Sequence, residues 1–305
     1  MIPKIVLGLF IISTLIQIAY WIIMFVKLSH RTPFPEKKCK HPVTTIICAR
    51  NEAENLNKNL HRILNQNYHL HRLLLVNDNS TDTTPEVLLN IQKNHKTFTL
   101  VNAEKTPEGM PGKKAALTQG IENADTDVLL MTDADCYPAS ADWAEIMQSQ
   151  MDEKTEIILG FSPYNKQKGW LNKLIRFDTV MIAMQYFTMA LAGMPYMGVG
   201  RNMAYRKSLF AKTGGFEKHK SIASGDDDLF IQQAATATNT KICLDQDSFM
   251  ISEPKHSWKE FFTQKARHIT TGKSYKSHHQ IILAMFLITL FVHLISGFGL
   301  LSQLM

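Results

Sequence analysis

The sequence predicts an α/β domain with a mostly parallel β-sheet, placed between two segments long enough to span a membrane. Between residues 43 and 131, short apolar β-rich runs alternate with helix-like stretches, and acidic segments follow several of these runs. An uncharged apolar run lies near each end of the chain. The chain has 305 residues, of which 45% are hydrophobic and 20% charged, so it can build a large core and is not a disordered protein.

The first apolar run, residues 5–26, carries no charge and is long enough to cross a hydrocarbon core of ~30 Å as a helix. A cleaved signal peptide is the alternative. However, the run exceeds the ~7–15 apolar residues of a signal core, and no small-x-small cleavage site follows it. We therefore expect a retained N-terminal transmembrane anchor over residues 1–30.

The second apolar run, residues 281–301, is interrupted only by Thr289, His293 and Ser296. It is also long enough to span a bilayer, so we expect a C-terminal transmembrane helix over residues 281–305. Just before it, Trp258, Phe261 and Phe262 recur at amphipathic helical spacing, which indicates an interfacial segment over residues 256–280 that lies against membrane lipids.

Basic residues flank both apolar runs on the side of the central region. Lys27, Arg31, Lys37, Lys38 and Lys40 follow the first run, and Lys265, Arg267, Lys273 and Lys276 precede the second. The positive-inside rule then predicts a multi-pass protein of the cell membrane, inner or plasma, with a cytoplasmic central region and both termini outside. The chain has a net charge of +6, but its Lys and Arg residues do not cluster on one helix face or in an aromatic patch. We therefore expect no nucleic-acid partner.

The central region, residues 41–255, reads as alternating strands and helices. Strands are expected at residues 43–48, 72–76, 97–101 and 127–131, and helices at 54–65, 85–93 and from Lys113 onward. Strands this apolar, separated by amphipathic helices, are typical of βαβ units in a parallel sheet that is covered on both faces. The ligands of such a sheet bind beyond the carboxyl ends of its strands.

One apolar, Met-rich run, residues 180–199, leaves two interpretations. It could span a membrane, but Gly193 and Pro195 interrupt it, and a span would put the two halves of the polar region on opposite sides. We therefore predict a buried or interfacial helix. The four cysteines, Cys39, Cys48, Cys136 and Cys243, lack the close pairs of a zinc site and are expected to be unpaired structural thiols.

Three acidic loops should meet at one edge of the sheet. "ARNEAEN" follows the first strand, "NDNSTDTT" the second and "TDAD" the fourth. In the last of these, Asp133 and Asp135 can both reach one hard divalent cation, with water and a diphosphate completing its coordination. An isolated D-x-D more often caps a helix or lies in a solvated turn, so the spacing alone is a weak signal.

The order of these segments makes the pattern specific. "TTIICARNEAENL", "LLLVNDNSTDTT", "PGKKAALTQGI", "VLLMTDADCYP", "GVGRNMAYRKSLF", "GGFE", "SGDDDLFIQQ" and "QKARH" together resemble the membrane-bound family 2 glycosyltransferases, similar to the inverting, polysaccharide-synthase-like members. The resemblance covers nearly everything between the two apolar runs. It implies a GT-A fold, Rossmann-like and mostly parallel with helices on both faces, that binds a nucleotide-diphosphate sugar and inverts the anomeric centre on transfer.

The resemblance also implies roles for individual residues. Asp78 would accept hydrogen bonds from the nucleobase or ribose, and Glu52 would line the same pocket. Lys113 would reach the nucleotide, although it could also be a solvated lysine at a helix start. Asp133 would face the ribose or sugar, and Asp135 would hold Mg²⁺ or Mn²⁺ against the diphosphate.

The catalytic base is expected among three consecutive acids. The family places it in an acidic pair before a helix, and here Asp226, Asp227 and Asp228 leave the register open by one residue. We favour Asp227 as the base with Asp226 as its neighbour, and place Asp228 at the helix N-terminus, where the macrodipole favours a negative charge.

Two further segments match the family in part. Asn202 in "GVGRN" is expected to frame the donor sugar, and Gln264 and Arg267 in "QKARH" match a motif that binds the diphosphate. His268 stands where processive polysaccharide synthases have Trp, which weakens any assignment to processive polymer synthesis, and we give His268 no catalytic role.

The function that this resemblance implies is transfer of a UDP-linked sugar to a hydroxyl of a glycan or lipid-linked acceptor at the cytoplasmic membrane face. One alternative is a polyprenyl-phosphate glycosyltransferase, and another is a non-catalytic nucleotide-sugar-binding membrane protein of the same fold. A nucleotidyltransferase would carry a Gly-rich phosphate loop after the first strand, and "ICARNEAEN" has no glycine.

Overall fold

The computed structural model of the chain describes residues 2–29, 40–104, 109, 110 and 112–302. It divides into two compact units, a central unit over Pro33–Thr271 and a terminal unit formed by Met1–Thr32 and Gly272–Met305. Four residues used in the sequence analysis lie outside the described residues, namely Arg31, Lys37, Lys38 and Cys39.

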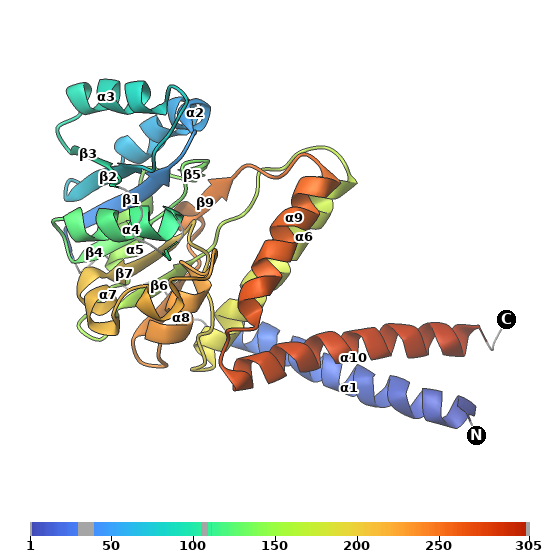
Figure 1. Ribbon diagram of the computed structural model, residues 1–305. Coiled ribbons are helices and arrows are strands. Elements are labelled where there is room, and N and C mark those ends of the chain that lie inside the picture. The colour runs from blue at the N-terminus through green and yellow to red at the C-terminus, as the bar shows by residue number, and fades with distance from the viewer. Residues whose placement is uncertain (1, 30–39, 105–108, 111, 303–305) are drawn as a thin grey trace. The chain divides into compact units, whose positions relative to one another are not determined.

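A seven-stranded sheet forms the frame of the central unit, in the order β3-β2-β1-β4-β7-β6-β8 (Figure 1). Its strands are β1 (Val43–Ala49), β2 (His71–Asn77), β3 (Phe98–Asn102), β4 (Val128–Met131), β6 (Ile157–Gly160), β7 (Met203–Arg206) and β8 (Thr240–Cys243). Only β7 runs antiparallel to its neighbours, β4 and β6. The prediction of a mostly parallel α/β sheet is confirmed, and β5 (Cys136–Pro138) pairs with β9 (Met250–Ser252) in a second, smaller sheet.

Helices cover both faces of the sheet, as strand alternation requires. Ile47 of β1 packs with Leu56 and Leu60 of α2 (Ala53–Leu64), in a cluster that also includes α3 (Thr84–Asn94). The preceding residue, Ile46, faces the opposite side, where α4 (Gly112–Asn123) approaches. A Cβ on Gly120 of α4 would lie 3.1 Å from Ile46, so glycine allows this close helix-to-strand approach.

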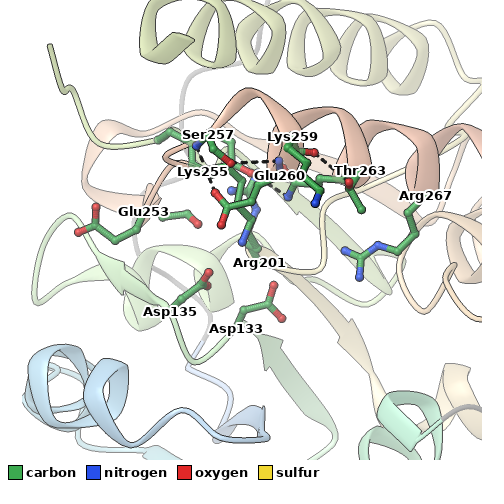
Figure 2. A pocket seen from close by; sticks show the side chains of 13 residues that line it. Asp133, Asp135, Arg201, Glu253, Lys255, Ser257, Lys259, Glu260, Thr263 and Arg267 are labelled. Atoms are coloured by element: carbon green, nitrogen blue, oxygen red, sulfur yellow. Dashed lines mark hydrogen bonds between the residues drawn. The ribbon is translucent and has the colours of Figure 1, made fainter. Parts of the chain in front are cut away.

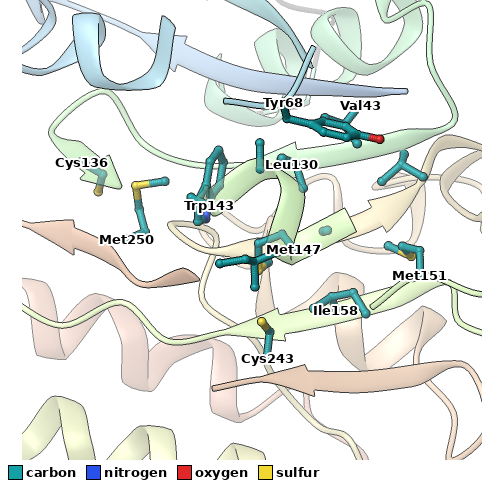
Figure 3. Packing of buried hydrophobic residues seen from close by; sticks show 14 residues of the cluster. Val43, Tyr68, Leu130, Cys136, Trp143, Met147, Met151, Ile158, Cys243 and Met250 are labelled. Carbon is teal, nitrogen blue, oxygen red and sulfur yellow. The ribbon is translucent and has the colours of Figure 1, made fainter. Parts of the chain in front are cut away.

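The far half of the sheet is covered in the same way. Trp143 and Met147 of α5 (Trp143–Ser149) pack on Leu130, Ile158 and other buried residues in the cluster shown in Figure 3. On the opposite face, aromatic rings from α7 (Lys207–Thr213) and α8 (Asp228–Ala234) contact a strand residue of β7. Three described cysteines, Cys48, Cys136 and Cys243, are free thiols, as expected.

One buried amide joins several parts of the core. The Oδ1 of Asn202 accepts a hydrogen bond from Nε1 of Trp143 at 3.0 Å, and its Nδ2 donates to the carbonyls of Phe161 and Ser248 at 2.7 and 2.9 Å. The exposed fraction of Asn202 is 0%. Because every group of this side chain is paired within the protein, Asn202 fixes the chain that enters β7 to the sheet and to α5.

The Met-rich run forms part of α6 (Trp170–Leu191), which begins well before residue 180 and ends at Leu191. Gly193 has φ of 77°, and the amides of Gly193 and Met194 donate to the carbonyls of Ala190 and Met189, which is a Schellman ending. Tyr186 and other residues of this helix are buried in the central unit. The run is therefore not one continuous helix over residues 180–199.

The last helix of the central unit, α9 (Trp258–Gly272), is amphipathic. Phe261 is buried at 6% exposure, whereas Trp258 and Phe262 are 49% and 59% exposed. This distribution agrees with the aromatic spacing in the sequence. The assignment of the segment to a membrane interface remains a prediction.

Two long helices form the terminal unit, α1 (Ile2–Ser29) and α10 (Ser277–Leu301), and they lie antiparallel side by side (Figure 1). Polar side chains join them: Gln17 donates to the Phe286 carbonyl at 2.9 Å, and Thr14 lies 3.0 Å from Nδ1 of His293. The spans Lys4–Ser29 and Ser277–Leu301 are long and apolar enough to cross a membrane, judged by length and composition. The expected domain boundaries and the membrane insertion of these helices stay predictions.

We predict that Asn202→Ala destabilises the central unit, because it leaves Trp143 Nε1 and two backbone carbonyls buried without partners. The expected loss is about 3 kcal/mol in the free energy of unfolding, or roughly 6–12 °C in melting temperature. Thermal unfolding of the purified protein in detergent measures this, with the exposed Asn123→Ala of α4 as a matched control. A melting temperature for Asn202→Ala equal to that of the control would contradict the structural role.

Candidate functional site

The loops after β1 and β2 are braced against each other. Asn51 and Asn79 both adopt positive φ, 58° and 52°, a conformation that asparagine tolerates better than most residues. The Asn51 amide donates to Oγ of Ser80 at 3.1 Å, and Oδ1 of Asn51 accepts from the Thr81 amide at 2.8 Å. This bracing fixes the backbone next to Glu52 and Asp78, the two predicted nucleotide-pocket acids.

Helix α4 begins directly beside Asp78. A Cβ on Gly112 would lie 3.3 Å from Oδ2 of Asp78, so the glycine of "PGKK" lets the first turn of α4 approach this carboxylate. The next residue, Lys113, places Nζ 3.1 Å from Asp133 and 3.1 Å from Asp226. The charges of Asp133 and then Asp226 raise the pKa of Lys113, so one ammonium group joins the acidic loop after β4 to the acids before α8.

Lys114, the following residue, fixes the segment that leads to those acids. It is 1% exposed, and its Nζ donates to the carbonyls of His219 and Ile222 at 2.7 and 3.0 Å. Burial lowers the pKa of Lys114. The two consecutive lysines of α4 therefore have different roles. Lys113 contacts the acids, and Lys114 holds the segment of chain before Asp226.

Asp133 and Asp135 lie just beyond the carboxyl end of β4. Burial, followed by the charge of Asp133, raises the pKa of Asp135. The Sγ of Cys136 donates to Oδ1 of Asp135 at 3.2 Å. The site thus crowds two carboxylates together, and a bound cation would relieve the repulsion between them.

This donor set fits Mg²⁺ or Mn²⁺. No group of three or more His, Cys, Asp or Glu side chains among the described residues is arranged to hold a metal ion. Mg²⁺ is commonly held by one or two carboxylates, with waters and substrate phosphates supplying the other oxygens. The Asp133 and Asp135 pair meets that requirement only together with a phosphate ligand.

The three consecutive acids contact three different parts of the central unit. Asp226 pairs with Lys113, as described above. Asp227 accepts from the Gly200 amide at 2.9 Å through Oδ2 and from the Asp228 amide at 2.8 Å through Oδ1. Asp228 accepts from Oγ1 of Thr271, at the end of α9, at 2.5 Å.

These contacts give the neighbouring acids opposite pKa shifts. Burial opposes ionisation of Asp226, but the Lys113 ammonium outweighs it and lowers the pKa of the carboxyl. Burial, together with the charges of Asp226 and Asp228, raises the pKa of Asp227 to about 7. Asp226 is therefore ionised at neutral pH, whereas Asp227 titrates near it.

A cavity of about 690 Å³ opens beside the acid pair, beneath α9 (Figure 2). This volume lies within the ~300–1,000 Å³ range of small-molecule sites. The lining residues include acids of the strand ends, bases and polar side chains of α9, and one arginine from the loop before β7: Asp133, Asp135, Arg201, Lys259, Gln264 and Arg267. The cavity thus places Asp133 and Asp135 opposite Arg201 and Arg267, while α9 also contributes the acid Glu260 (Figure 2).

The structure brings most of the predicted site residues together. Asp133, Asp135, Gln264 and Arg267 line the cavity, and Lys113 connects Asp133 to Asp226. Two others lie beside this group. Glu52 is close enough for the charges of Asp135 and Asp133 to raise its pKa, in addition to a larger effect of burial, and Asp78 adjoins Gly112.

Other predicted residues do not line the cavity. The side chain of Asn202 is fully buried and paired with core groups. Neither Asp226 nor Asp227 lines it, because Asp226 pairs with Lys113 and both carboxylate oxygens of Asp227 accept backbone amides.

Arg201 and Tyr164 both line the cavity, and the sequence assigned no individual role to either. Arg201 had a signal, since it is adjacent to Asn202 in the "GVGRN" segment. Tyr164 had none, because it lies in an irregular segment outside the motifs. Its ring lies under the Arg201 guanidinium, and its hydroxyl lies 3.5 Å from Nε2 of Gln264.

Comparison with known proteins agrees with this architecture. The model of glycosyl transferase family 2 matches residues 44–214. Probable glycosyltransferase YdaM of Bacillus subtilis is 28% identical over 184 residues, covering 57% of this chain and 43% of YdaM. The poly-beta-1,6-N-acetyl-D-glucosamine synthase of Staphylococcus aureus is 31% identical over 133 residues, covering 43% of this chain and 31% of the synthase. The chain thus spans less than half the length of these relatives.

Two solved structures share the fold. The mannosyltransferase PcManGT from Pyrobaculum calidifontis, in complex with GDP-Man and Mn²⁺, has a TM-score of 0.69 at 19% identity, covering 98% of this chain and 84% of PcManGT. S. aureus TarS 1-349, in complex with UDP-GlcNAc, has a TM-score of 0.50 at 15% identity, covering 70% of this chain and 59% of TarS 1-349. At these identities the likeness concerns the fold alone. Since the family model covers more than half of the chain, and the sheet has the GT-A arrangement, the protein belongs to glycosyl transferase family 2 and is a glycosyltransferase.

Proposed function

We propose that the protein transfers a sugar, with inversion, from a nucleotide-diphosphate sugar to a hydroxyl of a glycan or lipid-linked acceptor. The observation that carries the proposal is Lys113, whose ammonium joins Asp133, at the end of β4, to Asp226, before α8. This pairing supports a donor-binding role for Asp133 and a catalytic role for Asp226 within one site.

The donor is proposed to be UDP-linked. The TarS structure contains UDP-GlcNAc, and a staphylococcal relative is named poly-beta-1,6-N-acetyl-D-glucosamine synthase. PcManGT is described with GDP-Man, so guanosine nucleotides are the comparison to include in any screen. Asp78, beside the start of α4, and Glu52, directly before α2, are proposed to line the nucleoside pocket.

Asp135 is proposed to hold Mg²⁺ or Mn²⁺, with Asp133 beside it. A bound divalent ion would offset negative charge on the leaving nucleoside diphosphate. Gln264 and Arg267 reach the same cavity from α9 and are proposed to contact the diphosphate. Lys113 holds Asp133 in position from the opposite side.

Asp226 is proposed as the general base. An inverting transfer needs one carboxylate that accepts the proton of the acceptor hydroxyl, and access to that proton comes before pKa in choosing it. Asp226 pairs with Lys113, which also contacts Asp133, whereas both oxygens of Asp227 accept backbone amides. This assignment moves the base by one residue from the one that the sequence favoured, and it treats Asp227 as the residue that fixes Gly200 and the start of α8.

Helices α1 and α10 are proposed to cross the cell membrane, with the central unit in the cytoplasm. Both helices are apolar over a sufficient length. Basic residues flank both apolar runs on the side of the central region. A cytoplasmic site would have access to nucleotide sugars and to lipid-linked acceptors at the membrane face.

We predict that Asp135→Asn lowers metal-dependent sugar transfer by roughly 100-fold or more, because an amide binds a hard cation less well than a carboxylate. The assay supplies UDP and GDP sugars with Mn²⁺ and measures released nucleoside diphosphate. The matched control is Asp125→Asn, which removes an exposed carboxylate that pairs with Arg72. Full Mn²⁺-dependent transfer by Asp135→Asn would remove the metal assignment, and failure of the wild type with every donor would remove the proposed donor class.

We also predict that Asp226→Asn lowers transfer by roughly 10²-fold or more while donor binding is retained, because the amide cannot accept the acceptor proton. Asp227→Asn is expected to keep more transfer activity. If Asp227→Asn is inactive with donor binding intact and Asp226→Asn is active, the base is Asp227, as the sequence analysis favoured.

Asp227→Asn has a second readout that depends on its pKa. The native carboxyl keeps its proton up to a pH near 7, whereas the unfolded one loses it near pH 4. The native state thus binds more protons in this window, so the wild type loses stability as pH rises through it. Asp227→Asn lacks this titration, so its melting temperature relative to that of the wild type should increase as the pH rises from 5 to 8. A difference in melting temperature that does not change with pH would contradict the burial of this carboxyl group.

Cysteine labelling tests the proposed topology with two exposed positions. In intact cells, an impermeant maleimide should label Ser302→Cys, near the end of α10, and should label Lys96→Cys, in the central unit, only after permeabilisation. The wild-type protein controls for the native cysteines. The reverse pattern, or labelling of both positions in intact cells, would show that the central unit is not cytoplasmic.

A further inference from the structure

Arg201 is held rigidly at the edge of the cavity by its two neighbours. The amide of Gly200 donates to Oδ2 of Asp227 at 2.9 Å, and Asn202 is locked in the core by its three side-chain hydrogen bonds. The backbone on both sides of Arg201 is therefore fixed. The fixed backbone therefore determines where the Arg201 side chain leaves the chain and which part of the cavity it can reach.

An aromatic ring holds the Arg201 guanidinium in place. Its Cζ lies 4.4 Å from the centre of the Tyr164 ring, in a cation-π contact. Its Nη1 is buried and has no hydrogen-bond partner among the described residues. Figure 2 shows the side chain between α9 and the acid pair Asp133 and Asp135, whose charges act on it.

The Arg201 guanidinium is thus a hydrogen-bond donor that is positioned to bind a ligand. A buried N–H group normally has an acceptor, and a planar guanidinium matches the oxygens of a phosphate with two parallel hydrogen bonds. Arginine is also more weakly hydrated than lysine, which suits a stacked and partly buried position. The acid pair on the opposite wall would hold a cation, so a metal-bound diphosphate matches both walls.

We propose that Arg201 binds the diphosphate of the donor nucleotide, and that Tyr164 is the positioning residue that holds the guanidinium for this contact. The inference rests on the proposed function, because it requires a nucleotide-sugar donor. It adds a contact that the sequence motifs do not assign. It also transfers the donor-site role in "GVGRN" from Asn202 to its neighbour.

The contact would act on the leaving group. During transfer the bond between the anomeric carbon and the β-phosphate oxygen breaks, and its electron pair goes to that oxygen. The acceptor oxygen forms the new bond to the anomeric carbon, and its proton passes to Asp226. Arg201 would donate hydrogen bonds to the diphosphate oxygens as negative charge develops there, which is the placement that lowers a barrier.

The test separates the diphosphate from the rest of the nucleotide. Calorimetry with Mn²⁺ gives the Kd of the full-length protein in detergent for UDP, UMP and uridine, or for the guanosine series if the wild type binds GDP more tightly. We expect Arg201→Gln to raise the Kd for the diphosphate about 10- to 100-fold, with little change for the nucleoside. Arg201→Lys should recover part of the loss, since it keeps the charge without the fork.

Tyr164 gives a readout that a merely structural role would not produce. Tyr164→Phe keeps the ring and should bind UDP nearly as well as the wild type. Tyr164→Leu removes the ring and should lose the preference for UDP over UMP, as Arg201→Gln does, at an unchanged melting temperature. If Arg201→Gln does not fold, Arg201→Lys and the two Tyr164 variants still test the proposal.

The matched control is another arginine stacked on a tyrosine. Arg62 lies with its Cζ 4.3 Å from the centre of the Tyr137 ring, and neither residue lines the cavity, so Arg62→Gln should leave the UDP and UMP affinities unchanged. The proposal is overturned if folded Arg201→Gln keeps the wild-type preference for UDP over UMP, or if it weakens only acceptor use. If the wild type binds no nucleotide and transfers no sugar, the proposed function itself fails.

Discussion

The arrangement of the candidate site depends on three consecutive carboxylates, because each bonds to a different part of the central unit. Asp226 pairs with Lys113 of α4, Asp227 accepts the amide of Gly200, and Asp228 accepts from Thr271 at the end of α9. A short stretch of chain thereby sets the donor-site lysine, the loop that carries Arg201 and the helix that carries Arg267.

Charge crowding explains why the site should bind a metal with a phosphate rather than a metal alone. Two carboxylates at the end of β4 lie close enough that burial and mutual repulsion raise the pKa of Asp135. Among the described residues they have no third acidic, His or Cys side chain to complete a metal site. Arg201 and Arg267 face them across the cavity. A divalent ion bound to a diphosphate provides positive charge for one wall and negative charge for the other.

The sequence predicted the frame better than the side-chain partners. Apolar runs such as "VTTIIC" and "RLLLV" could be predicted as buried parallel strands, and the strand-end rule placed Asp78 and Asp133 at one edge. The antiparallel β7 carries no such signal, because buried parallel and antiparallel strands of this length look alike. Asn202 and Arg201 are adjacent, and only the folded core decides which of the two turns inward. The different contacts of Asp227 and Asp228 likewise depend on Gly200 and Thr271, which are distant in the sequence.

The most direct measurement of the central claim is a phosphorus electron-nuclear double resonance spectrum of Mn²⁺ bound to the protein. It uses the nucleoside diphosphate that the protein binds most tightly. We expect a phosphorus coupling that shows the diphosphate coordinated to protein-bound Mn²⁺, and loss of the bound species in Asp135→Asn. A spectrum identical to that of Mn²⁺ with the nucleotide alone, or an Asp135→Asn spectrum identical to that of the wild type, would contradict this metal site.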